Sequence, residues 1–341
     1  MTDMMLFLPS TKTSRQRRRL LQSAAAVLAL GIGGGAYAQS YPAKPIHLIV
    51  PFSAGGATDV LARILAQSLQ TTLKQSVVVE NRVGATGTLA ASYVAKAAPD
   101  GYTALFGGVG TNSLLEFTLP TLQYSPSRDF APAGNFCFVD FVMAVGHDSP
   151  YQTLADLLKD AKARPGEVSY QSAGPLGTLH VAQEYLWKTA GVELNHIPYK
   201  GESHVIPDLV SGRVDVAQLT LATARQLAAD GKIRMLATMA PERLVGAPDL
   251  PTVAEQGFPG FAMPTWNGVF FPKGTPDAVV QKINEAINVA LKDEAVRQQV
   301  LNMGIGPGQL NTPAEHAEFL ARERERWRRM VEESGIQVEK S

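Results

Sequence analysis

The residues with the clearest chemical potential form a turn of small side chains between a predicted strand and a predicted helix. Residues 51–59 read Pro-Phe-Ser-Ala-Gly-Gly-Ala-Thr-Asp and follow an apolar run at 46–50. Two adjacent glycines let the backbone bend sharply and approach a ligand without interference from a Cβ atom. The helix that follows offers unpaired amides and the positive end of its dipole. We therefore predict an anion-binding turn at the carboxyl end of a parallel strand.

Two further turns repeat this pattern. Residues 80–88 and 171–178 also place small residues directly before a predicted helix. Backbone amides of all three turns can donate hydrogen bonds to carboxylate oxygens, and nearby hydroxyl groups can add to them. These hydroxyls belong to Ser53, Thr86, Ser172 and Thr178. Three such turns suit one ligand that carries more than one carboxylate.

No sequence motif marks an enzyme. The first turn lacks the Gly-x-Gly-x-x-Gly pattern of dinucleotide sites, and neither a P-loop nor the Gly-x-Ser-x-Gly elbow of hydrolases occurs. We interpret Asp59 as a first-turn residue of its helix rather than as an acid catalyst. The carboxylates show no spacing that singles out an acid/base pair, although a pairing in three dimensions stays open.

The histidines also favour structural roles. His180 lies near the start of a predicted helix, and we interpret it as a packing or capping residue rather than a general base. No His-x-x-x-His pair suggests a metal site. His147 and His316 are isolated, and we predict that both are exposed. The sequence therefore predicts no catalytic residue, no metal ligand and no cofactor.

Alternating strands and helices must position the three turns. Apolar, β-branched runs predict strands at 46–50, 77–79, 102–106, 168–170 and 214–217. Helical periodicity predicts helices at 57–73, 86–97, 154–163, 178–190, 205–211, 276–303 and 313–334. Such alternation indicates an α/β fold whose parallel sheets are covered by helices.

Residues 1–38 read as an export signal peptide. Basic residues precede an apolar run of about 13 residues, which is shorter than the roughly 20 residues of a membrane span. Ala36-Tyr37-Ala38 supplies the small residues of a cleavage site. The arginines at 17–19 also resemble a twin-arginine signal, so the sequence leaves general secretion and twin-arginine export as alternatives.

The charge balance argues against a nucleic-acid partner. The whole chain carries 31 basic and 31 acidic residues. The leader holds five of the basic residues and one of the acidic ones, which leaves 26 against 30, a net charge of −4. The remaining length is sufficient for two domains with cores of their own. Cys137 is the only cysteine, which excludes an intramolecular disulfide, and its apolar neighbours predict a buried structural thiol.

Motifs along the chain resemble the Bug/TctC family of periplasmic solute-binding proteins, the receptors of tripartite tricarboxylate transporters. The resemblance runs from residue 41 to residue 336 in family order. Its motifs include the turn at 51–59, Val78-Val79-Glu80-Asn81-Arg82, His196-Ile197-Pro198-Tyr199-Lys200-Gly201 and Trp266-Asn267-Gly268.

The resemblance implies a type II periplasmic-binding-protein fold, in which a ligand cleft lies between two α/β lobes. Lobe 1 would comprise 39–145 and 265–341, lobe 2 would comprise 146–264, and hinges would lie near 144–148 and 262–266. Asp215 matches a family aspartate, for which a ligand hydrogen bond and turn stabilisation are equal alternatives. The implied ligand-binding residues are Phe52, Ser53, Gly55, Gly56, Ala85, Thr86, Gly87, Ser172, Gly177, Thr178 and Asp215.

We therefore predict a periplasmic receptor that captures a small carboxylate by lobe closure. Dicarboxylates, amino acids and aromatic acids are the ligand classes considered. The expected partners are subunits of a membrane transporter or a sensor kinase, and the protein is expected to be a monomer. A periplasmic hydrolase that uses the same cleft is the alternative. Residues 107–121 and 218–224 depart most from the family pattern, so the ligand cannot be transferred from relatives.

Overall fold

The computed structural model describes residues 41–263 and 265–338. The chain divides into two compact units, Met1–Ala43 and Lys44–Ser341, and the second unit is described below. The predicted signal peptide at 1–38 lies outside the described residues.

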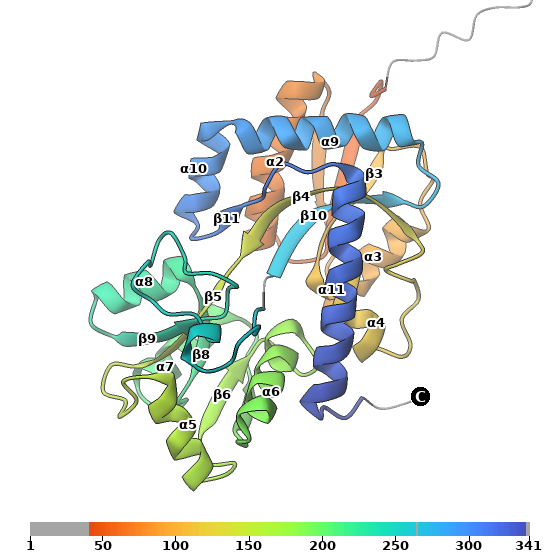
Figure 1. The fold of residues 1–341 in the computed structure, drawn as a ribbon. Coiled ribbons are helices and arrows are strands. Elements are labelled where there is room, and N and C mark those ends of the chain that lie inside the picture. The colour runs from red at the N-terminus through yellow and green to blue at the C-terminus, as the bar shows by residue number, and fades with distance from the viewer. Residues whose placement is uncertain (1–40, 264, 339–341) are drawn as a thin grey trace, which may run out of the picture. The chain divides into compact units, whose positions relative to one another are not determined.

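A six-stranded sheet contains the first three strands and the last two. β1 (Ile46–Val50) is parallel to β2 (Val77–Asn81) and to β3 (Thr103–Gly108). β10 (Thr265–Pro272) lies antiparallel between β3 and β4 (Phe130–Val139). The strand order is β11-β4-β10-β3-β1-β2. The chain therefore leaves this sheet after β4 and returns to its centre with β10 (Figure 1).

Helices from both ends of the chain accompany this sheet (Figure 1). None of the helices in the described ranges is both long and apolar enough to cross a membrane. The helices that accompany the six-stranded sheet are α2 (Ala57–Leu73), the 3₁₀-helix η1 (Ala85–Gly87), α3 (Thr88–Ala95), the π-helix η2 (Gly110–Leu114), α4 (Leu115–Thr118), α9 (Asp277–Lys292), α10 (Glu294–Asn302) and α11 (Pro313–Ser334).

Two smaller sheets come from the middle of the chain. β5 (Phe141–Gly146) lies antiparallel between β8 (Ala217–Thr220) and β9 (Ile233–Thr238). β6 (Ser169–Ser172) pairs in parallel with β7 (Asn195–Pro198). The accompanying helices are α5 (Leu154–Ala163), α6 (Thr178–Ala190), α7 (Glu202–Val210), α8 (Leu221–Ala229) and the 3₁₀-helix η3 (Ala254–Gln256).

Several predicted elements are confirmed, and others are wrong. The helices at 57–73, 154–163 and 178–190 have the predicted bounds. The single helix predicted at 276–303 is two helices, because Asp293 accepts a hydrogen bond from the Ala295 amide and caps the second one. The strand predicted at 214–217 lies instead at 217–220. The expectation of parallel sheets holds only for β1, β2, β3, β6 and β7. The other strands run antiparallel, since alternation along the chain does not fix the direction in which a distant strand returns.

The first connection between the six-stranded and three-stranded sheets is one residue long. Asp140 alone separates the end of β4 from the start of β5. Residues 144–146, part of the expected first hinge, are paired within the three-stranded sheet instead. The second expected hinge contains residue 264, which lies outside the described residues.

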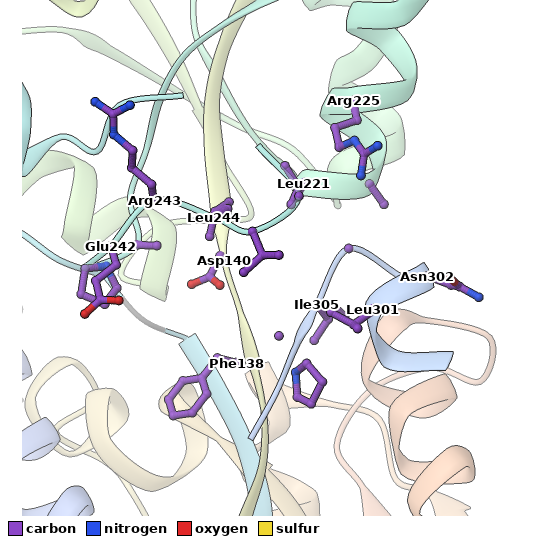
Figure 2. A pocket seen from close by; sticks show the side chains of 18 of the residues that line it. Phe138, Asp140, Leu221, Arg225, Glu242, Arg243, Leu244, Leu301, Asn302 and Ile305 are labelled. Carbon is purple, nitrogen blue, oxygen red and sulfur yellow. The ribbon is translucent and has the colours of Figure 1, made fainter. Parts of the chain in front are cut away.

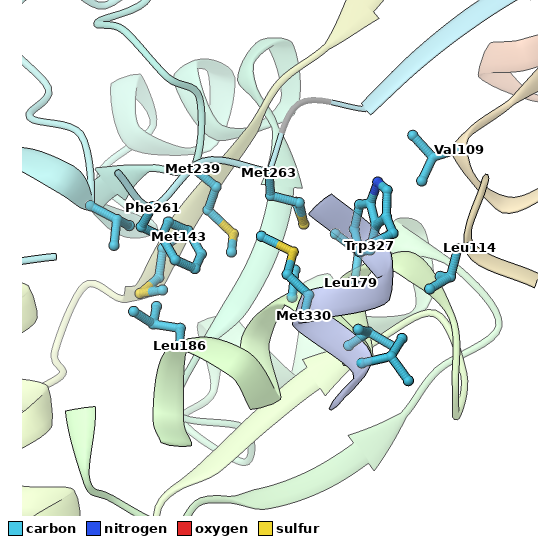
Figure 3. Packing of buried hydrophobic residues seen from close by; sticks show 14 of the residues in the cluster. Val109, Leu114, Met143, Leu179, Leu186, Met239, Phe261, Met263, Trp327 and Met330 are labelled. Carbon is cyan, nitrogen blue, oxygen red and sulfur yellow. The ribbon is translucent and has the colours of Figure 1, made fainter. Parts of the chain in front are cut away.

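One apolar core links residues of the six-stranded sheet, α6 and α11 to residues of the three-stranded sheet, and a separate core lies around α7 and α8. Figure 3 shows Trp327 and Met330 of α11 beside Leu179 of α6 and Met263. The tryptophans at 187, 266 and 327 are at most 1% exposed and belong to the first of these cores. Cys137 is also fully buried, and burial raises the pKa of its thiol to about 12. Helix α11 thus packs against both β4 and α6.

The exposure predicted for His316 is wrong. Its ring is 1% exposed and lies among Trp266, Phe270 and Phe319. Neither ring nitrogen has a hydrogen-bond partner among the described residues. Burial lowers the pKa of His316 to about 3, because the charged form would lose its hydration. His147, in contrast, is exposed as predicted.

We expect His316 to make the fold sensitive to acid. Between pH 6.5 and about 3 the unfolded chain binds a proton at this residue and the folded chain does not, so stability falls as pH falls. His316→Leu should reduce the stability lost between pH 7 and pH 4.5 by roughly 2–3 kcal/mol. Urea unfolding at the two pH values measures this loss. His147→Gln is the matched control, and an identical loss in both variants would contradict the assignment.

Candidate functional site

The first predicted turn joins β1 to α2. Residues 52–57 are exposed, including 44% of Phe52. Gly55 adopts a positive φ of 80°, which explains the requirement for glycine at this position. Gly56 is the N-cap of α2 and therefore supplies no side-chain acceptor to the helix. The first amides of α2 consequently remain available to an external acceptor.

Asp59 holds this turn in place. Its buried carboxylate accepts hydrogen bonds from the Gly55 amide (2.9 Å), from Arg63 Nε (2.9 Å) and Nη2 (3.0 Å), and from Asn81 Nδ2 (2.8 Å). The hydrogen bond from Arg63 is the main reason that the pKa of Asp59 falls to about 2. The interpretation of Asp59 as a first-turn residue is thus confirmed. The Gly55 amide is already engaged, and the Gly56 amide donates to Ser53 O (3.2 Å), so neither is free.

The second turn lies against the first. A Cβ atom on Gly87 would come within 3.0 Å of Pro51 Cβ and 3.1 Å of Thr111 Cγ2, which places η1 beside both the first turn and η2. Ala85 and Thr86 adopt positive φ values of 45° and 55° although neither is glycine. Such conformations are strained and tend to occur at functional positions. Both residues are exposed.

The third turn joins β6 to α6. Ser172 is fully buried, and its hydroxyl donates to Gly174 O (3.0 Å) and hydrogen-bonds His196 Nε2 (2.6 Å). The Leu176 amide donates to His180 Nδ1 (3.0 Å), while Leu176 itself has a positive φ of 59°. His180 therefore has the capping role that we predicted. Gly177 is the N-cap of α6 and again supplies no side-chain acceptor.

The free donors differ from the predicted set. The hydroxyls of Ser53, Thr86 and Thr178 have no hydrogen-bond partner among the described residues, whereas that of Ser172 is used within its own turn. The available backbone donors are the first-turn amides of α2 and α6 rather than the glycine amides at 55 and 56.

The structure brings the predicted residues together in two groups. One group contains the turns at 52–56 and 85–87, which contact each other through Pro51 and Gly87. The other is the turn at 172–178. Within the described ranges no hydrogen bond joins the two groups. A single ligand could contact both groups only if the two groups approached each other.

Asp215 lies apart from the third turn. Its carboxylate accepts hydrogen bonds from the Ser169 amide (2.8 Å) and hydroxyl (2.6 Å). Ser169 begins β6 and Ser172 ends it, so Asp215 lies roughly 10 Å from the turn along the strand. These contacts support turn and sheet stabilisation, one of its two alternatives.

The ionisable groups do not form a reaction centre. No cluster of three or more His, Cys, Asp or Glu residues in the described ranges could hold a metal ion. Ser172 and His196 are hydrogen-bonded, as a nucleophile and base would be, but the serine is fully buried and also donates to Gly174 O. A substrate carbonyl therefore could not reach its oxygen.

A separate groove of about 1260 Å³ lies over the connection between β4 and β5 (Figure 2). Phe138 and Asp140 lie in it, and none of the predicted ligand-binding residues does. Its arginines 243, 297 and 326 already pair with Glu255, Glu294 and Glu323. Burial raises the pKa of Asp140 to about 6. Arg225 and Arg322 also line the groove and form no ion pair within the described ranges.

Sequence reasoning missed His196 as a neighbour of the third turn. The register of β6 and β7 places His196 beside Tyr170 and on the same face as Ser172. This pairing joins segments about 25 residues apart, which the sequence does not specify. A usable signal was the spacing of His180, Glu184 and Trp187, since residues i, i+4 and i+7 share one helix face. That spacing indicates that α6 turns polar and aromatic side chains together toward the neighbouring strands.

Residues 61–336 match the sequence profile of the family described as "Tripartite tricarboxylate transporter family receptor". Three solved structures are similar. An R. palustris protein with adipate is 34% identical and has a TM-score of 0.78, covering 87% of this chain and 99% of its own. The periplasmic binding protein BugD is 32% identical with a TM-score of 0.75, covering 87% and 99%. MatC from Rhodopseudomonas palustris with malate is 31% identical with a TM-score of 0.75, covering 85% and 100%. The mixed α/β fold is thus that of these periplasmic binding proteins, which confirms the predicted fold class.

We expect Asp59→Asn to loosen the first turn. The asparagine NH₂ would replace an acceptor and face donors on Gly55, Arg63 or Asn81. The unfolding free energy should fall by about 2–4 kcal/mol. The pKa of Asp59 is depressed from 3.8 to about 2, so its contribution is present above pH 3.8 and is lost as pH falls toward 2, and most of the difference should remain at pH 4. Urea unfolding measures it, with the exposed Asp148→Asn as control. Equal stability of both variants would contradict the role of Asp59.

Proposed function

Because this chain belongs to the tripartite tricarboxylate transporter receptor family, we propose that it captures a small dicarboxylate between its first two turns and its third. One observation carries this proposal. Helices α2 and α6 begin at glycine and have no side-chain acceptor at the N-cap, as is also true of α3 and α7, whereas α5, α10 and α11 are capped by side chains. The helices at the predicted site therefore keep open donors, and the strained residues Ala85, Thr86 and Leu176 in the adjoining turns distinguish this site from the uncapped start of α7.

The two ends of a dicarboxylate match the two groups of donors. One carboxylate would accept hydrogen bonds from the first amides of α2 and from the Ser53 and Thr86 hydroxyls. The other would accept from the first amides of α6 and from the Thr178 hydroxyl. The exposed ring of Phe52 would cover the carbon chain between them. Ala85, Gly87, Ser172 and Gly177 would shape the turns rather than donate through side chains.

Similar proteins support this ligand class. Two relatives described above were solved with adipate and with malate, both dicarboxylates. Dicarboxylates of four to six carbons are therefore the first candidates, ahead of the amino acids and aromatic acids that the sequence also allowed.

Capture would proceed by closure of two lobes. The lobes expected from the sequence are 39–145 with 265–341, and 146–264. Since β5 pairs with β8 and β9, we move the first boundary to Asp140. A rotation there would bring the third turn toward the first two and remove water from the ligand.

The proposed partner is a membrane transporter that receives the ligand, with a sensor kinase as the other partner class. The receptor would act as a monomer in the periplasm after cleavage of the predicted signal peptide. BugD, a similar protein, is a periplasmic binding protein. The hydrolase alternative has no support, because the matched family consists of receptors and the Ser172 hydroxyl is buried.

Isothermal titration with a panel of dicarboxylates tests the ligand class. Succinate, malate, glutarate and adipate should include at least one ligand with saturable binding, and the matched monocarboxylates should bind more weakly because they lack the second carboxylate. Binding of amino or aromatic acids in preference to every dicarboxylate would contradict the proposed class. Turnover of an ester or amide substrate without saturable binding would favour the hydrolase.

We expect Gly56→Asp to block the α2 amides. Gly56 has extended backbone angles that any residue can adopt, and a Cβ there would meet only Ser53 O at 3.3 Å. The new carboxylate would cap α2 and repel the ligand, which should weaken dicarboxylate affinity by about tenfold or more. Gly56→Asn matches its size without the charge and should bind better than the aspartate variant. Affinity unchanged by Gly56→Asp would remove α2 from the site.

A further inference from the structure

Four side chains form a connected cluster behind the third turn. Tyr170 lies on β6, His196 on β7, and His180 and Glu184 on α6. The rings of His180 and His196 stack with centroids 4.0 Å apart, and the Tyr170 ring stacks on His180 at 6.4 Å. The Tyr170 hydroxyl donates to Glu184. The cluster therefore joins two strands to the helix whose N-terminus belongs to the proposed site.

His180 connects this cluster to the turn. The Leu176 amide donates to His180 Nδ1, so this nitrogen must be unprotonated and the ring proton must lie on Nε2. Leu176 has a left-handed conformation that is unfavourable for a side chain of its type. The hydrogen bond to His180 compensates for this strain and fixes the residue that immediately precedes the N-cap Gly177.

His196 supports the turn at its other end. Its Nε2 hydrogen-bonds the Ser172 hydroxyl, and that hydroxyl also bonds both the amide and the carbonyl of Gly174. The two stacked imidazoles thus hold both ends of the turn. Because like charges repel at this spacing, a charged His196 ring also disfavours protonation of His180.

We propose that His180, supported by His196, is the positioning residue of the third turn, and that protonation of its Nδ1 releases Leu176 and weakens ligand binding. A protonated Nδ1 is a donor facing the Leu176 donor, so their hydrogen bond cannot persist. The turn then loses the contact that balances its strained residue, and the first amides of α6 lose their fixed direction. The ligand part of this inference rests on the proposed function.

The buried and charged groups around His180 determine the pH at which its Nδ1 is protonated. Glu184 Oε1 lies 4.0 Å from His180 Nε2. Burial raises the pKa of Glu184, and the nearby charge of Glu193 raises it further. Tyr170 faces the same carboxylate. Helix α11 packs on α6 through apolar residues that include Trp327 and Met330. Burial, followed by the charge of His196, lowers the pKa of His180 to about 4, so release belongs to acid rather than neutral conditions.

Two variants separate positioning from general packing. His180→Asn keeps an acceptor at the position of Nδ1 and cannot titrate, whereas His180→Leu removes the acceptor. Without ligand, hydrogen exchange of the Leu176 amide should be slow in wild type and in the asparagine variant at pH 7.5, and fast in the leucine variant. Wild type should lose protection toward pH 4 while the asparagine variant keeps it. Equal exchange in all three proteins at both pH values would overturn the proposal.

Adipate titration supplies the second readout. At pH 7.5 the leucine variant should bind about tenfold more weakly than wild type, and the asparagine variant should stay near wild type. Toward pH 4.5 wild type should lose more affinity than the asparagine variant. Protonation of adipate itself weakens binding to both proteins equally, so the asparagine variant is the control for it. Parallel losses, or an affinity that rises with acid in wild type, would overturn the link to binding. If adipate does not bind wild type, the proposed ligand fails while amide exchange still decides the role of His180.

Discussion

A helix that begins directly after a strand leaves its first amide groups without backbone partners, and the rest of the candidate site depends on this constraint. In α5 and α11 a threonine N-cap and an acidic residue three positions later satisfy such donors in a capping box. In α2 and α6 a glycine occupies the N-cap, and the donors stay open. Helix α7 also begins at a glycine, Gly201, without a side-chain cap, so the conformation of the adjoining turn, and not the open donors alone, distinguishes α2 and α6.

Open turns need other side chains to hold their shape. Asp59 does this for the first turn by binding Gly55, Arg63 and Asn81 together, and His180 does it for the third by binding Leu176. Of the four non-glycine residues with positive φ in the described ranges, only Lys74 lies outside the candidate turns. Backbone strain is therefore concentrated where the ligand would bind, which is typical of functional sites.

The two regions that carry the turns are joined by shared packing as well as by strands. Helix α11 contacts β4 at the six-stranded sheet and α6 beside the third turn. Glu323 on this helix is buried, accepts a hydrogen bond from Trp266 Nε1 (3.2 Å) and pairs with Arg326 (2.9 Å). Burial raises the pKa of Glu323, as it does for Asp140 at the connection of the sheets. A closing motion must therefore preserve or exchange the polar contacts of these buried groups.

The sequence by itself determined the local features. Apolar periodicity gave the bounds of α2, α5 and α6, and the glycine pairs marked the uncapped helix starts, because both depend on neighbours within a few residues. Only the tertiary structure decided that β10 returns antiparallel to the middle of the first sheet, that His316 is buried, and that His196 stacks on His180. These features arise from pairing and packing between segments far apart in the chain, and side-chain spacing along one segment carries no record of its partner.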